Sequence, residues 1–66
     1  MEELQRFVDG FGLGISVEKL ASKAYNEMSK MGHEVWIVND RYLAVDGHEY
    51  QFIQSRKNNR WIVKEF

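Results

Sequence analysis

The spacing of the apolar residues changes at Glu34, and this change constrains the fold more than any other feature of the chain. Before Glu34, apolar residues recur every three or four positions, which is the spacing of one face of a helix. After it they recur at every second position, and β-branched and aromatic residues dominate, as strands require. The order predicts an α+β domain in which two N-terminal helices pack on a sheet.

The N-terminal part predicts two helices separated by a glycine-rich elbow. The segment from Glu2 to Phe11 carries apolar residues at helical spacing, and the elbow Gly10–Gly14 ends it. Ser16 is a good N-cap for the second helix, whose apolar face continues to Met31. Gly32 then provides a normal C-terminal stop.

The C-terminal part predicts a four-stranded antiparallel β-meander. Its expected strands are Glu34–Val38, Arg41–Val45, His48–Ser55 and Arg60–Phe66. Asn39-Asp40 and Asp46-Gly47 are expected two-residue turns, and Asp-Gly is among the strongest hairpin signals. The register of the last turn, Arg56–Asn59, stays open.

Two-residue turns would also fix which side chains share a face of the sheet. They place Trp36 opposite Leu43, and Leu43 opposite Tyr50. The face expected to be covered by the second helix comprises Trp36, Val38, Leu43, Val45, Tyr50 and Phe52. The other face is also apolar, with Val35, Ile37, Tyr42, Ala44 and Ile53. One helix cannot cover both faces, so we expect the first helix or another protein chain to cover the second one.

Length and composition indicate one domain spanning residues 1–66. There is no cysteine, which excludes disulfides and thiolate zinc sites. The formal net charge of −1 disfavours bulk nucleic acid or an anionic membrane as the partner. The N-terminus resembles no signal peptide, and no apolar run reaches the length of a membrane span, so we expect a cytoplasmic protein without a membrane partner.

Groups that carry chemistry are scarce, so we expect no enzyme, no catalytic residue and no cofactor. The glycine-rich elbow follows no strand and precedes no Gly-Lys-Ser/Thr, so it does not predict a phosphate loop. His33 and His48 are the only histidines, and each begins an expected strand. Those strands would lie two spacings apart, roughly 9.5 Å, which is wide for ligands of one ion. We therefore expect no metal site.

The leading functional hypothesis is a small protein–protein interaction or regulatory module. Its support is the doubly apolar sheet together with the C-terminal strand, an expected exposed edge. The expected contact residues are Val35, Ile37, Tyr42, Ile53 and Phe66. Either a second copy of the chain or one larger protein would be the partner. Free-standing chains of this size without catalytic groups are typical of bacterial or phage modulators.

The alternative hypothesis is a nucleic-acid-binding domain that uses the last hairpin. Arg56, Lys57, Arg60 and Lys64 form a basic segment there. Trp61 lies within this segment, and Tyr50 and Phe52 lie on the neighbouring strand. Basic residues interleaved with aromatic ones can bind single strands by stacking and phosphate contact. Salt separates the two hypotheses, because only nucleic-acid binding should weaken steeply as salt rises.

Overall fold

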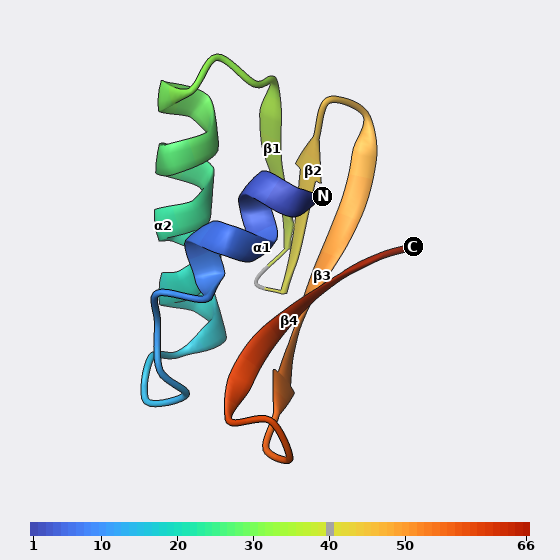
Figure 1. Ribbon diagram of the computed structural model, residues 1–66. Helices are drawn as coiled ribbons and strands as arrows, with labels where there is room; N and C mark the ends of the chain where they lie inside the picture. Colours follow the sequence, from blue (N-terminus) through green and yellow to red (C-terminus); the bar gives the residue numbers. More distant parts are fainter. Residues whose placement is uncertain (40) are drawn as a thin grey trace.

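The computed structural model describes residues 1–39 and 41–66, which form two helices and one antiparallel sheet (Figure 1). The helices are α1 (Glu2–Val8) and α2 (Val17–Lys30). The strands are β1 (Val35–Asn39), β2 (Tyr42–Val45), β3 (His48–Ser55) and β4 (Arg60–Glu65). They lie in the order β1-β2-β3-β4, all antiparallel, so the α+β class and the meander are confirmed.

Helix α2 begins and ends as its sequence predicts. The Ser16 hydroxyl accepts a hydrogen bond from the Lys19 N–H at 3.2 Å and caps the N-terminus. At the other end Gly32 has φ +95°, and its N–H donates to the Ser29 carbonyl. The next N–H, that of His33, donates to the carbonyl of Met28. These two bonds form a Schellman motif, which explains why a glycine stands there.

Helix α1 is shorter than predicted, since it ends at Val8 and not at Phe11. Beyond Val8 the N–H groups of Gly10 and Phe11 bond three residues back, to Phe7 and Val8, which tightens the chain into a turn. Phe11 still packs, because its ring lies edge-on to that of Phe7 with centroids 5.2 Å apart. The helical spacing therefore reflects a partly buried contact between Phe7 and Phe11, while Gly10 ends the helix early.

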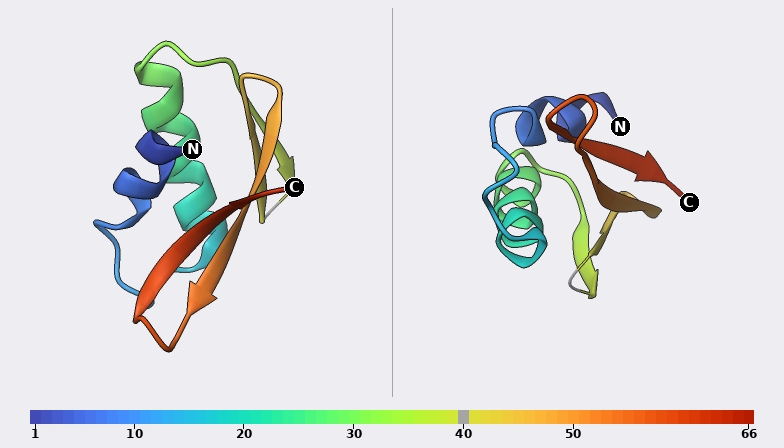
Figure 2. Two further views of the ribbon diagram at one scale, coloured as in Figure 1. Left: turned by 45° about the vertical axis from the view of Figure 1, so that its right-hand side comes forward. Right: turned by 90° about the horizontal axis from the view of Figure 1, so that it is seen from below.

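Both helices lie on the same face of the sheet (Figure 2). Helix α1 packs against β4, and α2 packs against β1 and β2. The core between these layers is formed by Leu4, Val8, Leu20, Ala21, Ala24, Met28, Leu43, Val45, Tyr50, Phe52 and Trp61. We call this side of the sheet the covered face.

The β2–β3 hairpin follows the prediction. Asp46-Gly47 forms a two-residue turn with positive φ at both positions, 52° and 86°. Val45 accordingly lies opposite His48, and Leu43 lies opposite Tyr50. The turn thus sets the register of the two central strands.

The other two connections could be predicted less well. Ser55 lies opposite Arg60, so Arg56–Asn59 is the loop of the last hairpin. Asn59 closes it with φ 52°, a conformation that asparagine tolerates. The predicted turn Asn39-Asp40 falls partly outside the described residues, which do not include Asp40.

The pairing of β1 with β2 differs from the prediction by one residue. Ile37 lies opposite Leu43, and Asn39 lies opposite Tyr42. Val38 is therefore an extra residue on β1, a β-bulge. Because side chains alternate along a strand, a shift of one residue moves the side chains of β1 to the opposite face.

This shift overturns the predicted faces of β1. Val35 and Ile37 belong to the covered face, because they pair with Val45 and Leu43, which are buried there. Trp36 was expected to be covered by α2, but it lies on the opposite face with 58% of its surface exposed. Val38, also expected to be covered, is 48% exposed at the bulge.

Candidate interaction surface

The face of the sheet opposite the helices carries a set of apolar side chains that no helix covers. Ladder pairing and alternation assign to it Trp36, Tyr42, Ala44, Ile53, Ile62 and Phe66, with Glu49, Gln51 and Lys64 among them. We call this the open face. Tyr42, Ala44 and Ile53 lie here as predicted, and Phe66, expected only as part of an exposed edge, lies here too.

Helix α1 does not cover the open face, although this was one of the two coverings expected from the sequence. It lies beside α2 on the covered face (Figure 2). The expectation that the first helix covers this face is therefore wrong, and covering by a second protein chain stays a prediction. In the described structure Trp36, Ile53 and Phe66 are exposed to solvent.

Aromatic packing organises one part of the open face. The Phe66 N–H donates to the Glu49 carbonyl at 3.1 Å and so extends the β4 ladder past Glu65. This places the Phe66 ring against Tyr42, with centroids 4.8 Å apart. Phe66 is nevertheless 69% exposed, so the pair presents an apolar surface to solvent.

A side chain of α1 covers part of the sheet edge at β4. The Gln5 amide oxygen accepts from the Val63 N–H at 2.8 Å, and its nitrogen donates to the Trp61 carbonyl at 2.9 Å. These two backbone groups point away from β3 and would otherwise bond to another strand. The prediction of an exposed C-terminal edge strand is therefore wrong at these two residues.

Among the described residues, no side chain bonds the outer edge of β1 in this way. The Glu34 carbonyl accepts from the Asp46 N–H at 2.8 Å, so the backbone of Glu34 points toward β2. Backbone direction alternates along an antiparallel strand, so that of Trp36 also points toward β2 while Val35 and Ile37 point outward. The order of the described strands places nothing beyond β1. We call the outward N–H and C=O groups of Val35 and Ile37 the free edge.

The side chains of β1 do not protect this free edge. The strand reads Val-Trp-Ile-Val-Asn and contains no charged residue and no proline, which are common protections of edge strands. Ile37 is 50% exposed even though it faces the covered side. A β-bulge can also hinder the addition of a strand. The bulge of β1, however, lies at Val38, after Val35 and Ile37, so it does not interrupt the free edge.

His33 joins three separate segments at one end of the sheet. Its Nδ1 lies 2.6 Å from Asp46 Oδ2, and its Nε2 lies 3.4 Å from the Glu3 carboxylate. The other Asp46 oxygen accepts from the Glu34 N–H at 3.0 Å. The hydrogen bond to Asp46, followed by that to Glu3, raises the pKa of His33 above 6.5. The same hydrogen bond lowers the pKa of Asp46.

We expect the protein to lose stability as the pH rises through the raised pKa of His33. The folded state holds the His33 proton more tightly than the unfolded chain does, so this contribution is complete below pH 6.5 and disappears above the raised pKa. Chemical unfolding of the wild type and His33→Gln between about pH 6 and pH 8 measures it. The wild type should show the steeper fall, and equal slopes would contradict the assignment.

His48 has a different partner, and the two histidines do not converge. Its Nδ1 lies 2.7 Å from Glu65 Oε2, on the adjacent strand β4. Among residues 1–39 and 41–66, no group of three His, Cys, Asp or Glu side chains could hold a metal ion. The absence of tight metal binding stays a prediction.

The aromatic residues that suggested nucleic-acid binding by the last hairpin are not accessible. Trp61, Tyr50 and Phe52 are buried on the covered face and cannot stack on bases. Arg60 pairs with Asp9 at 2.8 Å, and both side chains are more than one-third exposed. Hydrogen bonding to Gln5, and secondarily to Arg60, lowers the pKa of Asp9. Arg56 and Lys57 in the loop, and Lys64 on the open face, remain as exposed cations.

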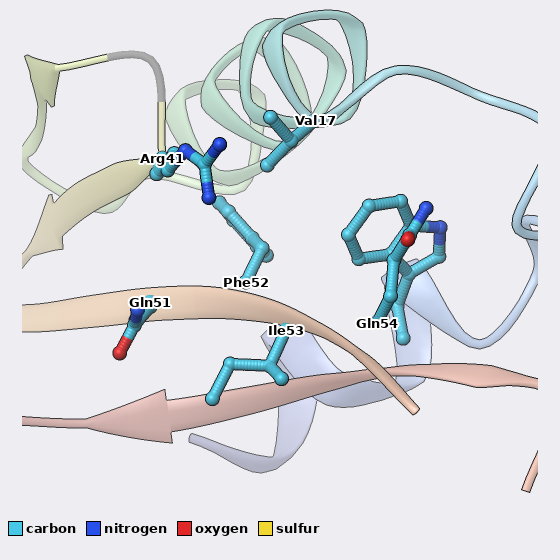
Figure 3. A pocket seen from close by; sticks show the side chains of 7 residues that line it. Val17, Arg41, Gln51, Phe52, Ile53 and Gln54 are labelled. Atoms are coloured by element: carbon cyan, nitrogen blue, oxygen red, sulfur yellow. The ribbon is translucent and has the colours of Figure 1, made fainter. Parts of the chain in front are cut away.

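A small cavity of about 310 Å³ lies where β3 extends past the start of β2 (Figure 3). It is lined by Val17, Arg41, Gln51, Phe52, Ile53, Gln54 and Trp61. Arg41 and Val17 lie on one side of β3 with Phe52, while Gln51 points to the other side. Its volume is at the low end for a ligand pocket, so the cavity could hold only a small molecule.

Comparisons of the chain with protein-family models, with curated proteins and with solved structures find no match. None of the described helices is both long and apolar enough to span a membrane.

Proposed function

We propose that the protein is a non-enzymatic interaction module that binds another protein chain through the free edge of β1 and the adjoining part of the open face. The observation that carries this proposal is the difference between the two edges of the sheet. Gln5 bonds the Trp61 carbonyl and the Val63 N–H on the outward side of β4, whereas the outward groups of Val35 and Ile37 have no strand beside them in the described chain. An exposed edge of this kind binds an added strand by main-chain hydrogen bonds.

The side chains near the free edge support the same proposal. Trp36 and Ile37 are each at least half exposed and lie on opposite faces of one strand. An added strand would bury both, and tryptophan is among the residues most enriched at the centres of protein interfaces. Tyr42 and Phe66 extend the apolar surface across the open face. The proposal places this module in the cytoplasm, with a regulatory role.

A lysine on the free edge should remove binding and leave the fold intact. In Ile37→Lys the added charge meets the incoming strand, a device by which natural edge strands prevent pairing. The measurement is affinity capture from native extract with quantitative mass spectrometry, together with sedimentation of the purified protein. We expect partners of either kind, a second copy or another protein, to be depleted at least about tenfold, equivalent to ~1.4 kcal/mol.

The matched control is Ile53→Lys, which adds the same charge at an exposed isoleucine of the open face, on β3, where Ile53 pairs with Ile62 of β4. It should retain edge-dependent partners. If the wild type recovers no chain that Ile37→Lys loses, the proposed function is wrong. If only Ile53→Lys loses binding, the open face and not the free edge is the contact.

A further inference from the structure

We infer that the occupant of the free edge is a second copy of this chain, whose β1 pairs antiparallel with the first about a two-fold axis at Trp36. This inference rests on the proposed function and specifies its partner. The result would be one continuous sheet in which the two β1 strands are central.

A two-fold axis at Trp36 pairs all the outward groups of the free edge. In this register Val35 of one copy lies opposite Ile37 of the other, and the reverse holds by symmetry. Each is a hydrogen-bonded pair, because the backbone of both residues points outward. The N–H and C=O groups that β1 leaves unpaired within the chain are therefore bonded between the copies.

A two-fold axis at Ile37 satisfies fewer groups. It pairs Ile37 with its own copy but places Val35 opposite Asn39. The backbone of Asn39 is directed toward Tyr42 of β2, because the Phe52 N–H bonds to the Arg41 carbonyl and so fixes the alternation along β2. Val35 would stay unbonded, so the bulge at Val38 favours the axis at Trp36.

The side chains suit the same axis. Trp36 meets its copy in a non-hydrogen-bonded pair, where Cα atoms are about 4.5 Å apart and side chains are closest. Both rings lie on the open face, so each exposed indole covers the other. On the covered face, half-exposed Ile37 packs beside Val35 of the second copy.

Charge presents no obstacle to this pairing. The strand Val35–Asn39 carries no charged side chain, and Glu34 falls opposite Val38 of the second copy. Like charges therefore do not face each other across the axis. A self-complementary interface must avoid such contacts, because each residue near the axis meets a residue of the second copy of the same chain.

Disulfide trapping tests the axis, because the chain has no native cysteine. Trp36→Cys should crosslink to a dimer under mild oxidation, since Cα atoms about 4.5 Å apart fit a disulfide. Val38→Cys is the matched control on the same strand and is similarly exposed. Its copies would lie roughly 13 Å apart along the strand, beyond disulfide reach. We expect Trp36→Cys to crosslink at least about tenfold faster.

Two measurements on the unaltered protein accompany the trapping, since replacing Trp36 removes part of the interface. Sedimentation should give twice the chain mass of 7.8 kDa at high concentration. Amide exchange at Val35 and Ile37 should slow as concentration rises, because those N–H groups gain partners only in the dimer.

The outcomes separate this inference from the proposed function. Faster crosslinking at position 38 than at 36 would overturn the axis. A monomeric protein with rapidly exchanging Val35 and Ile37 amides would overturn the dimer. The proposed function would survive that result if Ile37→Lys still lost another protein from the extract, and it would fail together with the dimer if no chain bound.

Discussion

Trp61→Ala is expected to lose ~3–5 kcal/mol of stability, the usual cost of truncating a buried tryptophan. Trp61 is 2% exposed at the centre of the core, and its indole Nε1 donates to the Gly12 carbonyl at 3.0 Å. It therefore packs under α1 and also ties the glycine-rich elbow to β4. A domain of this length has a total stability of about 3–10 kcal/mol, so the variant should melt far below the wild type or fail to fold.

A second substitution keeps this prediction measurable if the alanine variant is unfolded. Trp61→Phe retains a ring but leaves the Gly12 carbonyl without its donor, so we expect a smaller loss of about 1–3 kcal/mol. Thermal and urea unfolding followed by circular dichroism measure both variants. Near-wild-type melting of Trp61→Ala would contradict the assigned position of this side chain.

The charged residues of the same hairpin provide the contrast. Removing Arg56, Lys57 and Arg60 together should leave melting close to the wild type, because surface changes usually stay within about 0.5 kcal/mol each. Arg60 loses only an exposed ion pair with Asp9, a kind of contact that adds little to stability. If this triple variant remains folded, its affinity for random single-stranded DNA tests the nucleic-acid alternative. Binding by the wild type that the triple variant loses would favour that alternative.

Gln5→Leu is the second change with a large expected effect, about 1–3 kcal/mol for each backbone group left unsatisfied. The variant retains a good helix former of similar size but removes both bonds to the β4 edge, those with Val63 N–H and Trp61 C=O. Amide exchange gives a local readout. The Val63 amide should become fast, while those of Ile62 and Lys64, which point toward β3, stay slow.

The neighbouring residue of α1 offers a matched control. Arg6→Leu adds the same side chain at a position that is exposed and pairs only with Glu2, one turn earlier. It should change stability by within about 0.5 kcal/mol and leave Val63 protected. Equal destabilisation by the two variants would show that Gln5 acts through the helix and not through the edge.

Local signals predicted the elements whose boundaries depend on local chemistry. Ser16 and Gly32 fixed the ends of α2, and Asp46-Gly47 fixed the central hairpin. Each of these features acts within a few residues, through a cap or a turn. The end of α1 was predicted less well. Phe7 and Phe11 are spaced as residues on one face of a helix, but they contact each other across a turn that follows the helix.

The faces of β1 could not be predicted, because one bulge at Val38 reverses them and apolar residues occur at every position from Val35 to Val38. Alternation of polar and apolar residues normally shows which face of a strand is buried. Where both faces are apolar, the pattern fits either register equally well. The hydrogen bonds from Gln5 to the edge of β4 could not be predicted either. Gln5 lies 58 positions from Val63, and a lone glutamine on a helix carries no signal that it bonds a strand near the other end of the chain.

The unequal edges of the sheet also limit how many copies can join. If β4 were open, its outward groups could pair with β1 of another molecule, and such head-to-tail addition would continue into a filament. Gln5 bonds the Trp61 carbonyl and the Val63 N–H, so a further strand cannot pair with β4 at these two groups. If β1 pairs with its own copy, as we propose, assembly through that edge ends at two copies, and one glutamine on a short helix hinders growth from the other edge.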